Sequence, residues 1–197
     1  MMSFKYDSSK SKYCYPGIDI LINKLDIKDE KILNEAESLY TAQRLLELES
    51  TPIKGTFDLH HLQKIHHYIF QDLYPFAGKL REENISKGMT SFASFQYIEP
   101  CAKDLFDKLK SDNYLKDTTL EGFSVNSAFY MAELNMLHPF REGNGRSIRE
   151  FLRCLALNCN YNLQWTAVGE DELLEAFIES IIDYKRLADC IKRTISD

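Results

Sequence analysis

The sequence has no apolar run long enough to cross a bilayer, and residues 1–10 contain no apolar signal core. We therefore expect a cytoplasmic protein without a membrane partner. Positive charge is also scarce, because 24 basic residues stand against 30 acidic ones and the net charge is −6. Broad nucleic-acid binding requires a basic face, so direct binding to nucleic acid is not expected.

The sequence also lacks paired cysteines and internal repeats. The number of cysteines is odd, no Cys-x-x-Cys occurs, and the spacing is irregular: Cys14, Cys101, Cys154, Cys159 and Cys190. We expect reduced, structural thiols. A chain of 197 residues is expected to form one domain. The polar start predicts an N-terminal arm over residues 1–30, followed by a single globular domain over 31–197.

The chain does contain one dense group of residues that could take part in catalysis or ligand binding, between residues 137 and 150. Apolar residues recur at helical intervals on both sides of it. Pro139 disfavours helical geometry at His138, so the first helix is expected to end there. Gly143-Asn144-Gly145 allows backbone amides to turn toward one point. The first amides of the next helix lack internal partners and lie at its positive end, which predicts an anion site.

The side chains of this segment suit phosphate chemistry. Arg146 and Arg149 lie one turn apart on one helix face and offer planar forks of donors. Glu142 would repel a phosphate unless a cation lay between them, and one carboxylate with phosphate oxygens commonly holds Mg²⁺. His138 can accept a hydroxyl proton. The segment predicts a nucleotide polyphosphate, a divalent metal and a hydroxyl nucleophile.

Each feature alone has a plainer explanation, since a Gly-Asn-Gly is often a simple turn and arginines at a helix start are commonly solvated. Their adjacency favours the functional interpretation, which needs all of them together. A histidine group on one predicted helix lacks the i,i+4 spacing of helical metal ligands. We expect these to be core or surface histidines: His60, His61, His66 and His67.

Residues 138–149 resemble, without gap or substitution, the signature of the Fic (filamentation induced by cAMP) family, His-Pro-Phe-x-[Asp/Glu]-Gly-Asn-Gly-Arg-x-x-Arg. Residues 57–78 resemble the helix and turn before the Fic flap, and residues 15–25 resemble the arm of short Fic toxins. Ser86, Lys87 and Gly88 resemble the flap itself. The resemblance extends from about residue 13 to about 190. It implies a mainly α fold, a Fic-type helical bundle with one small β-hairpin flap.

The resemblance implies a protein adenylyltransferase, which moves AMP from ATP to a Tyr, Ser or Thr hydroxyl of a target protein. By position, His138 is the general base and Glu142 holds Mg²⁺. The flap residues Ser86, Lys87 and Gly88 would dock the target. The residues implied to hold the nucleotide phosphates are Gly143, Asn144, Gly145, Arg146 and Arg149. Two alternatives stay open: a Fic-fold transferase with another nucleotide or phosphoryl donor, and a catalytically silent binding module.

Many Fic proteins carry an inhibitory helix with the pattern [Ser/Thr]-x-x-x-Glu-[Gly/Asn], whose Glu pairs with the second motif arginine. The nearest match, residues 166–171, departs at its last position and has Gly169 in its middle, so we predict a loop and helix start there. The resemblance then implies a separate small antitoxin that supplies the helix, with this chain as the toxin half of the pair. It also makes a type II topoisomerase subunit a candidate target.

Periodicity predicts helices over 29–50, from 57 or 58 to Tyr74-Pro75, over 102–109, on both sides of the motif, and over 173–195. Residues 80–98 predict the hairpin, with strands at 89–92 and 95–98.

Overall fold

The computed structural model describes residues 11–88 and 90–196, and within them the fold is mainly α, as predicted. The helices are α1 (Glu30–Ser50), α2 (Leu59–Phe70), α3 (Ile98–Ser111), α4 (Leu120–Leu137), α5 (Asn144–Asn158), α6 (Glu170–Glu179) and α7 (Lys185–Thr194). Two small antiparallel pairs join β1 (Ser86–Lys87) to β2 (Thr90–Ser91), and β3 (Asn162–Leu163) to β4 (Ile195–Ser196).

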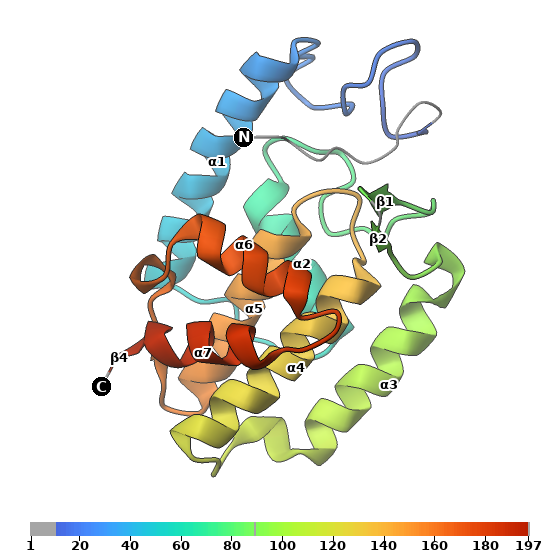
Figure 1. Ribbon diagram of the computed structural model, residues 1–197. Coiled ribbons are helices and arrows are strands. Elements are labelled where there is room, and N and C mark those ends of the chain that lie inside the picture. Colours follow the sequence, from blue (N-terminus) through green and yellow to red (C-terminus); the bar gives the residue numbers. More distant parts are fainter. Residues whose placement is uncertain (1–10, 89, 197) are drawn as a thin grey trace.

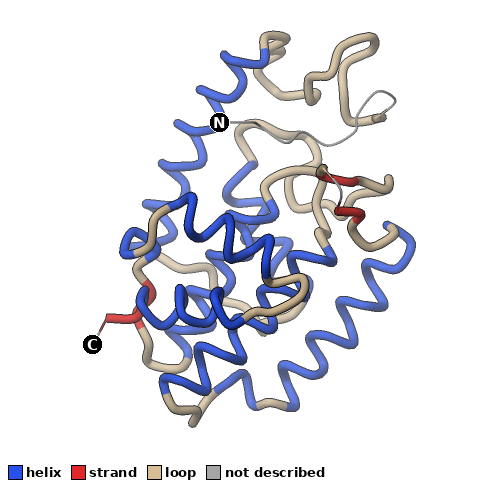
Figure 2. Tube along the Cα trace, in the orientation of Figure 1, coloured by secondary structure: helices blue, strands red, loops and turns tan. Residues whose placement is uncertain are grey.

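Helix α5 lies between α2 and α4, and these three helices enclose the core. Helix α1 covers α2, while α3 and α7 lie against α4 and α6 packs on α7 (Figure 1). Helix α5 buries most of its side chains, including Ile148, Phe151, Leu152 and Leu155. The hairpin of β1 and β2 lies near the loop that joins α4 to α5, and it is the red strand region at the upper right of Figure 2. The motif loop is therefore held on a rigid pair of buried helices.

Polar residues cap the helix starts where the sequence places them. Asp29 accepts a hydrogen bond from the Ile32 amide, at 3.0 Å, and begins the long helix α1 predicted over 29–50. Asp58 caps α2 through the His61 amide at 2.8 Å, so this helix begins next to the predicted start at residue 57 or 58. Such caps satisfy amides that the helix itself leaves without a partner.

The predicted end of α2 at Tyr74-Pro75 is wrong, because the helix ends at Phe70. The amides of Leu73 and Tyr74 both donate to the Phe70 carbonyl, at 3.0 Å each. This tight turn buries Leu73 and Tyr74 against the core. Core packing has therefore ended the helix ahead of the proline.

The predicted strand over 95–98 is wrong as well. Residues 95–97 form a 3₁₀ turn and Ile98 begins α3. The Ala93 amide donates to the Met136 carbonyl of α4 at 3.1 Å, and the Phe95 amide donates to Asn84 Oδ1 at 3.0 Å. These bonds turn the chain out of the hairpin. The observed hairpin pairs Ser86 with Ser91 and Lys87 with Thr90, and Met89 lies outside the described residues.

The helix predicted over 173–195 is two helices, α6 and α7, with a turn over 180–184. Figure 1 shows α6 and α7 side by side, so the turn folds the chain back on itself. Ile182 in this turn is 94% exposed. The apolar period runs across the turn without a proline or glycine, so the sequence offers no break there.

The chain ahead of α1 is attached to the bundle. The Lys24 amide donates to the Leu73 carbonyl at 2.7 Å, and the Glu82 amide donates to the Tyr13 hydroxyl at 3.0 Å. The arm boundary at residue 30 coincides with the start of α1, but the division into arm and domain stays a prediction. Among the helices that the structure describes, none combines the length and hydropathy that a bilayer crossing requires.

Candidate active site

His138 lies where α4 ends, in the left-handed conformation with φ 46°. Its Nδ1 is 2.9 Å from the Asn135 carbonyl oxygen, so Nδ1 carries the proton and Nε2 is the acceptor nitrogen. The ring stacks on Phe92 of the flap connection, with centroids 3.7 Å apart. Burial lowers the pKa of His138 to about 3. The imidazole is therefore neutral at pH 7, as a proton acceptor must be.

The Asn144 side chain closes the motif loop onto itself. Its Oδ1 accepts from the Phe140 amide at 2.9 Å, and its Nδ2 donates to the Phe140 carbonyl at 2.8 Å. Phe140 is fully buried and serves as the loop's apolar anchor. Both polar atoms of Asn144 are thus engaged within the loop, so its predicted contact with phosphate rests on its backbone amide at the start of α5.

His66 on α2 supports the same loop. Its Nε2 lies 2.9 Å from the Glu142 carbonyl oxygen, and its Nδ1 accepts from the Gly78 amide at 2.8 Å. Its ring stacks on Phe140 at 3.8 Å. Burial lowers the pKa of His66 to about 3, so the ring is neutral. The histidine is a structural support for the motif.

Gly143 is the N-cap of α5 and has φ +79°, a backbone conformation that side chains disfavour. A Cβ atom built there would lie 2.1 Å from Cζ of the buried Phe70. The loop can therefore follow this path only with glycine at 143. The path leads directly into the first turn of α5, where the anion site is predicted.

Glu142 and Arg146 face each other across the first turn of α5, with Glu142 Oε1 3.9 Å from Arg146 Nη2. The Gly143 amide also donates to Glu142, at 2.8 Å. The pKa of the Glu142 carboxyl is raised, chiefly by burial and further by the charge of Glu37. A cation bound at Glu142 would offset the electrostatic repulsion from Glu37, so this carboxylate is a suitable metal ligand.

Arg149 follows Arg146 by one turn, as the spacing predicted. Burial and the charge of Arg146 lower its pKa, while Glu170 at the start of α6 acts in the opposite direction. Over residues 11–88 and 90–196, no carboxylate forms an ion pair with Arg149. Arg149 thus presents a half-buried positive charge beside the start of α5.

Ser86, Lys87 and Gly88 form the hairpin that lies beside His138, and the charge of Lys87 contributes to the lowered pKa of the histidine. Gly88 has φ +59°, in the left-handed region that favours glycine. The hairpin is short, and the side chains of Lys87 and Ser91 are exposed.

Arg81 joins the flap to the base and was missed by the sequence analysis. Its side chain is 2% exposed, and its Nε donates to the His138 carbonyl at 2.8 Å. The same guanidinium donates to the carbonyls of Leu137, Glu83 and Ala93. Nothing local marks this arginine, because its partners on the motif lie 56 and 57 residues away in the sequence.

Glu37 and Thr41 on α1 were also missed. Arg146 Nη2 donates to Glu37 Oε1 at 2.5 Å, and Nη1 donates to Thr41 Oγ1 at 3.2 Å. Both residues lie on the inward side of α1, in line with the buried Leu33 and Leu48. An acidic residue within an apolar stripe is a signal that the sequence does contain.

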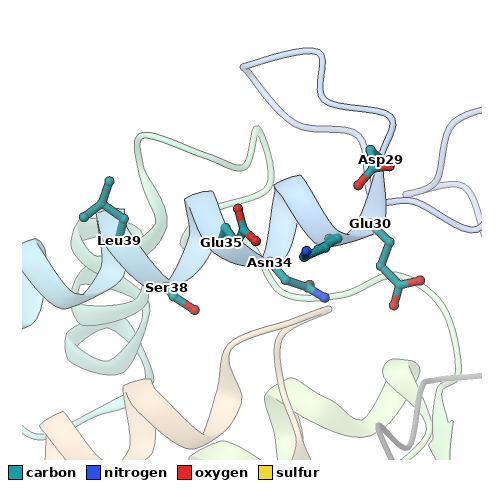
Figure 3. A pocket seen from close by; sticks show the side chains of 7 residues that line it. Asp29, Glu30, Asn34, Glu35, Ser38 and Leu39 are labelled. Atoms are coloured by element: carbon teal, nitrogen blue, oxygen red, sulfur yellow. The ribbon is translucent and has the colours of Figure 1, made fainter.

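A large hollow on the surface lies elsewhere. It is an open groove of about 940 Å³ along the first half of α1, and none of the predicted site residues lines it (Figure 3). The lining residues are Asp29, Glu30, Lys31, Asn34, Glu35, Ser38 and Leu39. The candidate site is therefore defined by the motif and the flap.

Comparison with known proteins agrees with this geometry. Residues 56–156 match the model of the Fic/DOC family. The chain is 41% identical over 176 residues to "Protein adenylyltransferase VbhT" of Bartonella schoenbuchensis, covering 89% of this chain but only 37% of that protein. It is 37% identical over 171 residues to "Probable protein adenylyltransferase Fic" of Escherichia coli, covering 86% of this chain and 84% of that one.

Solved structures show the same fold. The BepC protein of Bartonella tribocorum, with bound AMPPNP, superposes with a TM-score of 0.85 at 24% identity, over 93% of this chain and 96% of that one. The Fic domain of a cell filamentation protein from Bartonella quintana, with bound ADP, gives 0.87 at 25% identity, over 93% and 94%. The family match, the relatives and the intact motif lead to one conclusion: this chain belongs to the Fic/DOC family.

Proposed function

We propose that this chain is a protein adenylyltransferase that transfers AMP from ATP to a Tyr, Ser or Thr hydroxyl of a target protein. The observation that carries the proposal is the neutral His138 beside the helix start that bears Arg146 and Arg149. The names of the relatives from Bartonella and Escherichia coli support the same reaction, and the ADP and AMPPNP bound in the solved relatives support a nucleotide co-substrate.

The proposed step begins with His138, whose Nε2 takes the proton of the incoming hydroxyl. The hydroxyl oxygen forms a bond to the α-phosphorus of ATP, and the bond to the β-phosphate breaks to release pyrophosphate. Arg146, Arg149 and the first amides of α5 neutralise the charge that develops on the leaving group. Positioning and charge stabilisation therefore provide most of the acceleration.

Glu142 is the residue that would hold Mg²⁺, because its carboxylate lies at the same helix start and already bears the repulsion of Glu37. Mg²⁺, when bound with the nucleotide, supplies positive charge at the phosphates. The flap is proposed to receive an extended stretch of the target by strand addition at Ser86, Lys87 and Gly88, which would bring a hydroxyl to His138.

We also propose that the chain is the toxin half of a toxin–antitoxin pair, whose small partner places a Glu against Arg149. The support is the Arg149 guanidinium, which within the described residues has no carboxylate at ion-pair distance. The substrate is a protein, and a type II topoisomerase subunit is the candidate that the resemblance to short toxins favours. Full activity of the purified chain alone is the expected result. Strong activation by a C-terminal truncation that spares Arg149 would refute the partner.

The test of the activity uses bacterial lysate, Mg²⁺ and ATP labelled at the α-phosphate. The wild-type chain is expected to label a protein band, and His138→Ala is expected to lower the rate roughly a hundredfold to ten-thousandfold, the usual effect of losing a general base. Labelling by His138→Ala at the wild-type rate would remove the assignment of the base. No labelled band with either chain would favour the binding-module alternative.

A further inference from the structure

Two residues hold the carboxylate of Glu37 in place. One of them is the motif arginine Arg146, which lies 109 residues further along the chain. Glu37 Oε1 accepts from Arg146 at 2.5 Å, and its Oε2 accepts from the hydroxyl of Tyr74. Tyr74 is 2% exposed, and burial and the Glu37 charge raise the pKa of its phenol, so the hydroxyl remains a donor. Glu37 is therefore fixed in place before any ligand arrives.

Arg146 is correspondingly fixed from four sides. Glu37 and Thr41 accept from its two terminal nitrogens, Glu142 lies 3.9 Å away, and its guanidinium lies over the Phe70 ring at 4.7 Å. An arginine has five N–H donors, and Glu37 and Thr41 use two of them. Three N–H groups are left for an anion, so these contacts orient the guanidinium without exhausting it.

We infer that Glu37 is a positioning residue for the nucleotide, which acts by holding Arg146 in the orientation that receives a phosphate group. The inference rests on the proposed function and extends the site to helix α1. A free arginine side chain must lose rotamer freedom when it binds a ligand, and that loss weakens binding. With Glu37, Thr41 and Tyr74 in place, the folded protein has already ordered Arg146.

The opposite role would be a latch, in which Glu37 neutralises Arg146 and keeps phosphate away. Arg146 keeps unused N–H donors, and its guanidinium is packed over the Phe70 ring. Both observations favour the role in which Glu37 orients Arg146. The two roles predict effects of opposite sign, so one series of variants separates them.

The experiment measures the dissociation constant of ATP with Mg²⁺ by calorimetry, and kcat/KM for AMP transfer, for Glu37→Ala, Glu37→Gln and Thr41→Val. Glu35→Ala is the matched control, because it removes the same charge from the exposed side of α1. We expect Glu37→Ala to weaken ATP binding about tenfold, in line with the loss of groups that orient a binding residue. Glu37→Gln keeps one acceptor oxygen, which can still receive the Arg146 hydrogen bond, and should lose less. Glu35→Ala should change binding less than twofold.

A double-mutant cycle distinguishes positioning from a structural role. In an Arg146→Ala background, Glu37→Ala should add less than twofold, because Glu37 acts through Arg146. Equal losses in both backgrounds, unchanged binding, or tighter binding by Glu37→Ala would each overturn the inference. If Glu37→Ala fails to fold, Glu37→Gln and Thr41→Val carry the same test. The binding measurement needs no transfer, so a wild-type chain that binds ATP without transferring AMP refutes the proposed function alone.

Discussion

Replacing Gly143 by alanine should damage the motif loop through two separate costs. The residue has φ +79°, and an alanine in a left-handed conformation costs about 1–2 kcal/mol. Its Cβ would also lie 2.1 Å from Cζ of Phe70, which is 0% exposed and cannot withdraw into solvent. Overpacking of this kind costs about 1–3 kcal/mol. The expected loss in the free energy of unfolding is therefore about 2–5 kcal/mol.

Urea unfolding of Gly143→Ala measures the sum, and the Phe70→Leu background separates the two costs. Without the ring, the clash is relieved and Gly143→Ala should cost only the backbone part, about 1–2 kcal/mol. In a thermal melt, each kcal/mol lowers Tm by about 2–4 °C for a domain of this size. A loss below about 1 kcal/mol in the wild-type background would refute the reasoning, as would equal losses in the two backgrounds.

Two further predictions concern the supports of the loop. His66 and His138 have pKa values of about 3 in the folded chain, against about 6.5 unfolded, so the unfolded chain binds more protons between these values. The contribution of the two histidines to the free energy of unfolding should be complete above pH 6.5. It should fall as the pH drops toward 3, by up to about 1.4 kcal/mol per pH unit for each histidine. Urea unfolding at pH 7 and pH 5, with a His66→Asn control, checks this. A free energy of unfolding that does not change over this range would contradict it. Arg81→Met removes the donors to four carbonyls and should lower the free energy of unfolding by about 3 kcal/mol or more. An unchanged Tm would show that these hydrogen bonds do not stabilise the fold.

The sequence predicted the features that local chemistry determines. The helices predicted from residue 29 and from residue 57 or 58 begin there, where Asp29 and Asp58 cap them, and α4 ends at His138 because Pro139 follows it. The motif places His138 at the end of α4 and Glu142 and Arg146 at the start of α5, and the family match confirms the resemblance. The roles assigned to individual site residues stay predictions.

The features that were wrong or missed depend on contacts between distant parts of the chain. The strand predicted over 95–98 is absent because Ala93 and Phe95 bond to Met136 and Asn84. Arg81 reaches the carbonyl of His138 across 57 residues, and Glu37 reaches Arg146 across 109. Periodicity and motif spacing carry no information about such pairs.

The central claim is that this site moves the α-phosphate of ATP to a protein, and the position of the label tests it most directly. Parallel reactions of the wild-type chain in lysate with Mg²⁺ would use ATP labelled at the α- or the γ-phosphate. We predict a protein band labelled from the α position only, because pyrophosphate carries the γ label away. Label from the γ position would show phosphoryl transfer instead and would contradict the account.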